Sequence, residues 1–278
     1  MDFLTLKVSC SDEIREILLA ELSFIGYDSF EETDIGITAS TDNPEFDDLK
    51  NQSIAILERY DLKEDSYQFL QVPKVNWNKE WEKNFDPVNV ADQVWIRAPF
   101  HEEKETFRYQ ININPKMSFG TGHHATTYLM VQALLDHNLS GKSVIDLGTG
   151  TGILMIMAHL LGAETIAGTD VDDWCIENSR ENLLLNKIEE AELKKGPIAT
   201  LAITEKYDFV LANINKNVLL SEMTHYQSLM KESSTLFLSG FYEKDEADML
   251  EKIKGLGMKV IASSTKNDWM CMVIDQDH

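Results

Sequence analysis

The feature that most constrains the fold is an apolar run that leads straight into three alternate glycines. Residues 143–147 are followed by Gly148, Gly150 and Gly152, and then by the apolar stretch that starts at Ile153. Glycines let a backbone approach a ligand closely, and the first turn of a helix offers free N–H groups. The pattern predicts a strand, a ligand-binding turn and a helix, the opening unit of a doubly wound α/β sheet.

The spacing of these glycines separates two kinds of ligand. It runs G-x-G-x-G, whereas the dinucleotide-binding turn runs G-x-G-x-x-G/A, and positions 153 and 154 are Ile and Leu. The spacing therefore favours a sulfonium cofactor, with its methionine carboxylate at the helix N-terminus, although the turn alone would also suit a phosphate. We assign Asp146, Gly148, Gly150 and Gly152 to the cofactor site.

From Asn138 onward, strand and helix patterns alternate. The last two strands are separated only by Asn267-Asp268, which is too short for a helical crossover, so they should pair antiparallel. The fold class predicted is α/β, namely the class I methyltransferase (Rossmann-like) fold: a mainly parallel sheet with a C-terminal antiparallel hairpin. Its strands are expected at Ser143–Leu147, Thr165–Thr169, Tyr207–Ala212, Thr235–Ser239, Lys259–Ser264 and Met270–Asp275.

The first 72 residues predict a separate small domain. Their apolar patterns follow the order βαββαβ, with strands expected at Phe3–Val8, Tyr27–Phe30, Ile35–Ala39 and Tyr67–Val72, which suits a ferredoxin-like α+β domain. Trp77, Trp81 and Phe85 then fall on one face of a short helix. We expect residues 1–72 to form this small domain, 73–99 to form a linker with an aromatic helix, and 100–278 to form the α/β domain.

Two polar residues end predicted strands of the large sheet. Asp170 stands twenty-two positions after Gly148, where a carboxylate can accept both hydroxyls of an adenosine ribose. Asn213 ends the strand LAN, where its amide oxygen can accept a hydrogen bond from an incoming nitrogen and direct the lone pair of that nitrogen. We expect Asp170 to bind cofactor, and Asn213 to act in both binding and catalysis.

A second glycine-rich segment, FGTGHHATT, precedes an amphipathic helix. Phe119 can cover an adenine or a methyl group, and the glycines would let the segment close as a lid. We place Phe119, Gly120 and Thr121 in the cofactor site. His123 is a candidate general base, although a solvated surface histidine fits as well. No metal is expected, because no Cys or acidic partner stands at zinc-like spacing from the histidines.

Charge and hydropathy narrow the partners. The formal net charge of −22 repels a phosphate backbone, so we expect no direct nucleic-acid specificity. Residues 1–65 hold 17 acidic side chains against 5 basic ones, which would attract a basic macromolecule. No stretch approaches the roughly 20 apolar residues that span a bilayer. We expect a cytoplasmic monomer without membrane association.

Together these motifs resemble the ribosomal protein L11 methyltransferases, the PrmA type. The resemblance rests on FGTGHHATT, VIDLGTGTGIL, GTDVDDWCIENSRENLLLN, LANINKNVLL and the connector WNKEWEKNFDPVNVADQVWI, and runs from about residue 76 to 240. Thr127, Gly148, Asp170 and Asn213 match cofactor-contacting positions of that family, and Phe119 matches its lid aromatic. Departures are Thr149 where Cys is frequent, Asn215 where an apolar residue is usual, and His124-Ala125 where His-Pro is common.

The resemblance implies a protein N-methyltransferase in which residues 1–72 form the substrate-recognition domain and residues 100–278 form the methyltransferase domain. It would move methyl groups from S-adenosylmethionine to lysine or N-terminal amines of a basic ribosomal protein of the large subunit, leaving S-adenosylhomocysteine. A methyltransferase for glutamine or nucleic-acid bases would usually carry Asn-Pro-Pro at the strand end, where this chain has Asn-Ile-Asn. Two other classes stay open: a nicotinamide-dependent oxidoreductase, and a non-catalytic binding module for ribosome assembly.

Overall fold

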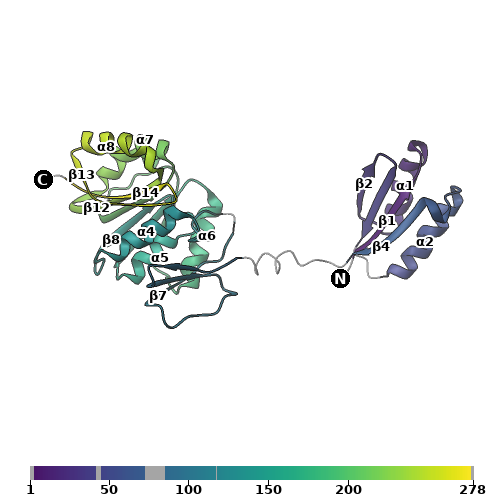
Figure 1. Ribbon diagram of the computed structural model, residues 1–278, viewed down its shortest axis with the longest axis horizontal. Helices are drawn as coiled ribbons and strands as arrows, with labels where there is room; N and C mark the ends of the chain where they lie inside the picture. Colours follow the sequence, from purple (N-terminus) through teal and green to yellow (C-terminus); the bar gives the residue numbers. More distant parts are fainter. Residues whose placement is uncertain (1–2, 42–44, 73–84, 117, 277–278) are drawn as a thin grey trace. The chain divides into compact units, whose positions relative to one another are not determined.

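The computed structural model describes residues 3–41, 45–72, 85–116 and 118–276. The chain forms two compact units, Met1–Asn84 and Phe85–His278 (Figure 1). Each unit has its own hydrophobic core, one in the first unit and two, on opposite faces of a sheet, in the second. Among the described residues, no helix is long and apolar enough to cross a membrane.

The first unit has the predicted ferredoxin-like topology. Its four strands lie in the order β2-β3-β1-β4 and every pair is antiparallel. The second strand starts two residues later than expected, because the backbone N–H of Tyr27 donates to the Leu22 carbonyl at 3.1 Å and completes the C-terminal cap of the preceding helix at Gly26. The elements are β1 (Phe3–Ser9), α1 (Asp12–Ile25), β2 (Ser29–Thr33), β3 (Gly36–Thr41), α2 (Phe46–Arg59), the 3-10 turn η1 (Glu64–Ser66) and β4 (Tyr67–Val72).

The second unit is built on a seven-stranded sheet in the order β10-β9-β8-β11-β12-β14-β13. The strands β10, β9, β8, β11 and β12 are parallel, and β14 is antiparallel to both β12 and β13. This is the predicted mainly parallel sheet with a C-terminal hairpin. The strands are β8 (Ser143–Leu147), β9 (Thr165–Asp170), β10 (Glu192–Lys195), β11 (Tyr207–Asn213), β12 (Met230–Tyr242), β13 (Met258–Lys266) and β14 (Trp269–Gln276).

The turn of that hairpin follows from its two residues. Asn267 and Asp268 both have positive φ, at 51° and 64°. Asn and Asp tolerate this left-handed conformation, and two consecutive left-handed residues make the tight turn that matches the twist of antiparallel strands. The predicted break at Asn267-Asp268 is confirmed, with Lys266 paired to Trp269 across it.

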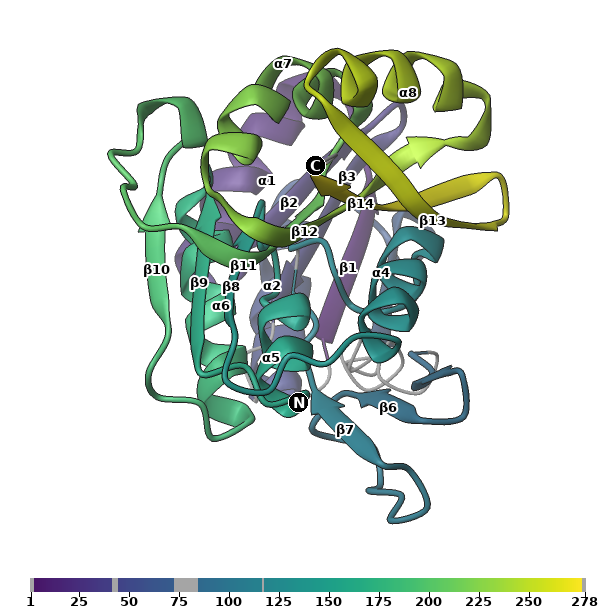
Figure 2. The same cartoon turned by 90° about the vertical axis from the view of Figure 1, so that its left-hand side faces the viewer.

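Helices cover both faces of the sheet. On β8, Val144 belongs to one buried cluster and its neighbour Ile145 to the other, because successive strand residues point to opposite faces. The first cluster includes residues of α4, α5 and α6, and the second residues of α7 and α8, which lie at the top of Figure 2. The helices are α4 (Ala125–Leu135), α5 (Ile153–Leu160), α6 (Asp173–Leu185), α7 (Lys216–Ser228) and α8 (Glu246–Gly255), with 3-10 turns η2 (Ile198–Thr200) and η3 (Glu243–Asp245).

A three-stranded sheet precedes the large one and was not predicted. It consists of β5 (Val88–Val90), β6 (Val94–Arg97) and β7 (Tyr109–Asn112), with β5 and β6 antiparallel and β6 and β7 parallel. Two of these strands lie within the expected linker 73–99, so that residues 85–99 belong to the second compact unit. Of the expected aromatic helix, Trp77 and Trp81 lie outside the described residues.

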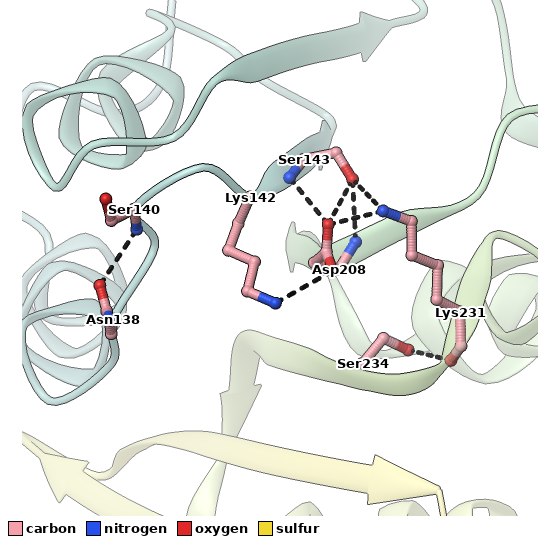
Figure 3. A network of polar contacts seen from close by, with 7 residues as sticks. All are labelled: Asn138, Ser140, Lys142, Ser143, Asp208, Lys231 and Ser234. Atoms are coloured by element: carbon pink, nitrogen blue, oxygen red, sulfur yellow. Dashed lines mark hydrogen bonds and ion pairs between the residues drawn. The ribbon is translucent and has the colours of Figure 1, made fainter.

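An ionic network ties three strands together at their amino ends (Figure 3). The Asp208 carboxylate accepts hydrogen bonds from the backbone N–H and the hydroxyl of Ser143, at 2.9 and 2.8 Å, and from Lys231 Nζ at 2.7 Å. Lys142 Nζ lies 3.5 Å from its other oxygen. Burial raises the pKa of Asp208, but these bonds outweigh it and hold the pKa well below its usual range. The network joins β8, β11 and β12 at the end of the sheet away from the glycine turn.

Candidate active site

The glycine turn packs against the Phe119 segment, which we define as residues 118–124. Gly150 has φ +56°, and a Cβ on it would lie 2.3 Å from the Phe119 carbonyl oxygen. Only glycine can occupy this position without moving one backbone or the other. The two glycine-rich motifs therefore meet in a direct backbone contact.

The turn is also fixed to the end of β9. The backbone N–H groups of Gly148 and Thr149 both donate to the Thr169 carbonyl, at 2.8 and 2.9 Å. The N–H of Gly150 donates to Asp170 Oδ2 at 2.9 Å, and the N–H of Asp172 to Oδ1 at 3.2 Å. Each carboxylate oxygen has a second lone pair, so Asp170 is held in place and can still accept hydroxyl groups.

A cavity of about 610 Å³ opens at the carboxyl ends of β8, β9 and β11. This is where ligands bind in open parallel sheets, and the volume is in the range of cofactor sites. Three carboxylates line it and, among the described lining residues, no lysine or arginine does, so it favours cations. The lining residues are Phe119, His124, Thr126, Leu147, Gly148, Gly150, Thr169, Asp170, Val171, Asp172, Cys175, Gly196, Pro197, Ile198, Asn213, Ile214, Asn215, Val218, Glu222, Gly240 and Trp269.

Asn213 lies in this wall as the last residue of β11. Its Oδ1 is buried and has no hydrogen-bond partner among the described residues. The chain turns sharply after it: the N–H of Ile214 donates to the Ser239 carbonyl at 3.1 Å, and a Cβ on Gly240 would lie 2.1 Å from the Ile214 carbonyl oxygen. A buried amide oxygen left without a donor is costly, and an incoming N–H group would satisfy it.

The two adjacent histidines have different surroundings, and His123 does not line the cavity. Its Nε2 lies 2.7 Å from the Asp86 carbonyl oxygen and its Nδ1 3.2 Å from the Thr121 hydroxyl. Because a carbonyl oxygen only accepts, Nε2 carries a proton and donates. The ring also packs on Phe85, with centroids 4.5 Å apart. His123 thus fastens residues 85–86 to the Phe119 segment, and this placement does not support the predicted role as general base.

His124 is the histidine that lines the cavity. It caps α4, where the Thr126 N–H donates to its Nδ1 at 3.3 Å. The ring makes edge contacts with Phe119 and Trp269, at centroid distances of 5.1 and 4.6 Å. Burial lowers the pKa of His124, so the imidazole is neutral at physiological pH, with its proton on Nε2.

Two other predicted residues lie beneath the cavity wall. Thr127 and Asp146 are 0% and 1% exposed, and neither lines the cavity. The Thr127 hydroxyl and both Asp146 oxygens have no hydrogen-bond partner among the residues described. Burial, with a smaller contribution from the Asp170 charge, raises the pKa of Asp146 to about 7, and the nearby Thr149 hydroxyl opposes this.

The remaining predicted residues shape the turn without lining the cavity. Gly120 accepts a hydrogen bond through its carbonyl from the Thr151 hydroxyl at 2.6 Å, and Thr121 contacts His123. Gly152 caps α5 in the left-handed conformation. Phe119, Gly148, Gly150, Asp170 and Asn213 are the predicted cofactor residues that the structure brings together in one wall.

Several lining residues were not predicted. His124, Glu222 and Trp269 come from the start of α4, from α7 and from the start of β14. Gly196-Pro197 follows the short strand β10, and the Gly196 N–H donates to the Asp170 carbonyl at 2.8 Å. The Gly-Pro dipeptide marks a turn and is the one signal that could have placed this segment.

One group of possible metal ligands lies in the same wall. Among the described residues, Asp170, Asp172 and Cys175 have ligand atoms within 4.8 Å of one another. Both Asp170 oxygens already accept backbone N–H groups, and burial raises the pKa of the Cys175 thiol, which disfavours the thiolate a metal would need. These residues fit a polar organic ligand better than a metal ion.

The walls fit S-adenosylmethionine at three places. Asp170 can still accept hydrogen bonds from ribose hydroxyls. Gly148 and Gly150 have no side chains, so the methionine moiety can lie close to their backbone. The Asn213 amide oxygen is available to accept a hydrogen bond. Three carboxylates in the wall suit its positive sulfur.

Comparison with known proteins agrees with this geometry. The family model for ribosomal protein L11 methyltransferase (PrmA) matches residues 13–277. The chain is 39% identical over 265 residues to a ribosomal protein L11 methyltransferase of Porphyromonas gingivalis, covering 94% of this chain and 91% of that protein. It is 32% identical to that of Chlorobaculum tepidum, covering 97% and 95%.

A solved structure, the ribosomal protein L11 methylase of Lactobacillus delbrueckii subsp. bulgaricus, superposes with a TM-score of 0.66 at 25% identity. It covers 70% of this chain and 100% of that one. These matches extend well beyond the motifs between residues 76 and 240 and support neither an oxidoreductase nor a non-catalytic module. The chain belongs to the ribosomal protein L11 methyltransferase (PrmA) family.

Proposed function

We propose that this enzyme transfers methyl groups from S-adenosylmethionine to lysine ε-amines, the N-terminal α-amine, or both, of ribosomal protein L11. Its relatives are named for that protein. The observation that carries the choice of an amine is Asn213: a buried amide oxygen without a donor, at the carboxyl end of β11, in the same cavity as Asp170.

The cofactor of this family supplies a methyl group on a positively charged sulfur, so the chain need only deliver a neutral nitrogen. The Asn213 oxygen accepts an N–H of the amine and so directs its lone pair into the cavity. A lysine ε-amine, with a reference pKa near 10.4, must first lose a proton to solvent water. The apolar neighbours Phe119, Ile214 and Trp269 disfavour the charged form and support this loss.

The charge of the cavity supports a cationic substrate. Asp172 and Glu222 line it, and Tyr226 donates to Glu222 Oε2 at 3.3 Å, which orients that carboxylate. A protonated lysine approaching the cavity is attracted by these groups before it is deprotonated. The acidic first unit supports the same kind of partner, a basic protein. Since ribosomal proteins are made in the cytoplasm, we also propose that the enzyme acts there.

Mass spectrometry of L11 after incubation with enzyme and S-adenosylmethionine tests this proposal. We expect methyl groups on lysine or N-terminal amines, and their incorporation about 100-fold more slowly with the Asn213→Ala variant under single-turnover conditions. Methyl groups on glutamine side chains of L11 would contradict the choice of an aliphatic amine. Transfer of methyl groups only to ribosomal RNA, when RNA is also supplied, would contradict it as well.

A further inference from the structure

One residue of the glycine turn holds two consecutive carbonyl groups of the Phe119 segment. The backbone N–H of Thr151 donates to the Phe119 carbonyl at 3.0 Å, and its hydroxyl donates to the Gly120 carbonyl at 2.6 Å. Thr151 is fully buried. The fit is tight, since a Cβ on Gly120 would lie 2.7 Å from the Thr151 hydroxyl oxygen. The backbone beside the Phe119 ring is thus attached to the turn by the protein's own hydrogen bonds.

Helix α6 then holds Thr151 and the chain that leads into the segment. Asn182 Nδ2 donates to the Thr151 carbonyl at 2.9 Å, and Asn182 Oδ1 accepts from the Asn114 N–H at 2.8 Å. One helical turn later, Asn186 accepts from the Asn112 N–H at 2.9 Å and donates to the Asn112 carbonyl at 2.7 Å. Two asparagines at i and i+4 therefore join the glycine turn to the end of β7.

We propose that Thr151, supported by Asn182 and Asn186, is a positioning residue that fixes the backbone of the Phe119 segment on the cofactor turn. The glycines of this segment predict a lid that closes as a whole. These bonds instead leave the Phe119 side chain, which is 51% exposed and lines the cavity, as the part that moves over the ligand. None of the three is predicted to touch the cofactor, so each acts through Phe119 and the turn.

Thr151→Val tests this inference in the full chain. The substitution keeps the β-branch and the backbone N–H but places a methyl group where the hydroxyl is 2.6 Å from a carbonyl oxygen, which must move. Thr151→Ser restores the hydroxyl. Thr165→Val is the matched control, because Thr165 is exposed and begins β9 at the opposite end of the sheet from the cavity.

Two readouts separate local positioning from general damage: hydrogen exchange of the backbone in cofactor-free protein, and calorimetric binding of S-adenosylhomocysteine. For Thr151→Val we expect exchange of the residue 151 N–H, which donates to the Phe119 carbonyl, to rise about tenfold and affinity to fall about tenfold, the effect of one lost hydrogen bond. Core strands β11 and β12 should keep their protection. Thr151→Ser and Thr165→Val should match the wild type in both measurements.

Three results would overturn the inference. The first is wild-type exchange and affinity in Thr151→Val. The second is a Thr151→Ser variant as impaired as Thr151→Val, which would show that the methyl group matters and the hydroxyl does not. The third is wild-type protein whose Thr151 N–H exchanges as fast as an amide in an exposed loop, and this last measurement requires no variant to fold. Each of these three results would overturn the inference regardless of which amine the enzyme methylates.

Discussion

The backbone N–H of Gly150 in the glycine turn donates to the Asp170 carboxylate over 2.9 Å, so the two predicted cofactor motifs are joined before any ligand is considered. Gly150 lies in the turn after β8, and Asp170 is the last residue of β9, the neighbouring strand in the sheet. The bond fixes where the carboxylate points. A ligand that needs the carboxylate therefore meets the turn as well.

Asp170→Ala should weaken S-adenosylhomocysteine binding about 100-fold. The substitution removes the acceptor for two ribose hydroxyls and also frees the N–H of Gly150, each worth roughly one to two kcal/mol. Isothermal calorimetry measures the dissociation constant. The matched control is Asp173→Ala, on exposed surface at the start of α6, which should bind as the wild type does. A dissociation constant unchanged by Asp170→Ala removes this residue from the cofactor site.

Asn213→Ala should slow methyl transfer about 100-fold while changing cofactor affinity by less than about threefold. The amide oxygen orients the amine, and that contact matters most when the amine attacks. Single-turnover kinetics on L11 give the rate. Asn138→Ala serves as control, because Asn138 caps a surface turn through Ser140 and lies outside the cavity lining. Equal single-turnover rates for wild type and Asn213→Ala would take Asn213 out of the mechanism.

Glu222→Gln should raise the KM for the protein substrate about three- to tenfold without changing the cofactor dissociation constant. This carboxylate lines the cavity on α7 and attracts the amine in its charged form. Steady-state kinetics at two salt concentrations measure this KM. Because salt screens the attraction, the difference in KM between variant and wild type should be smaller at the higher salt concentration. Glu251→Gln on the exposed face of α8 is the control. A fall in cofactor affinity, with KM unchanged, would assign Glu222 to the cofactor side instead.

Asp146→Asn should stabilise the protein at neutral and alkaline pH. In the folded state burial raises the pKa of Asp146 to about 7, so the folded protein binds a proton that the unfolded chain, with a pKa near 3.9, has released. The contribution of the protonated Asp146 carboxyl to the free energy of unfolding is largest below about pH 4 and declines as pH rises toward 7. Above pH 7 the variant should be roughly 2–4 kcal/mol more stable than the wild type.

Chemical denaturation across pH 4 to 8 checks this sign. The two proteins should converge near pH 4 and separate as pH rises. Asp208 gives the opposite case in the same molecule, because its hydrogen bonds from Lys231 and Ser143 hold its pKa low, so its contribution is lost as pH falls. A constant difference between Asp146→Asn and wild type across this range would mean that Asp146 is ionised in the folded state.

The parts of the fold that were predictable are those set by local sequence. An apolar run followed by alternate glycines favours a strand and a tight turn through local interactions alone, and residues 143–152 form both. Asn267-Asp268 likewise favours a two-residue turn, because both residue types tolerate positive φ. Both predictions were confirmed. Strand β10, by contrast, has the sequence ELKK, with neither β-branched residues nor alternation, and becomes a strand because β9 offers it an edge.

The candidate site also combines residues that the local sequence could place with residues that only the fold could place. Asp170 and Asn213 could be located because each ends a predicted strand, and the ends of parallel strands meet at one edge. The sequence could not show which of His123 and His124 lines the cavity, because the two residues are of the same type and adjacent, and only the fold gives them different surroundings. Trp269 reaches the cavity through the C-terminal hairpin, and the pairing of that hairpin with β12 sets its place.

A crystal structure of the enzyme with S-adenosylhomocysteine is the most direct test of the proposed cofactor site. We expect ribose hydroxyls on Asp170, the amino acid moiety against Gly148 and Gly150, and the sulfur facing Asn213 across the cavity. A ligand bound elsewhere, or a cavity in which Phe119 and Trp269 leave no room for it, would contradict this placement of the cofactor.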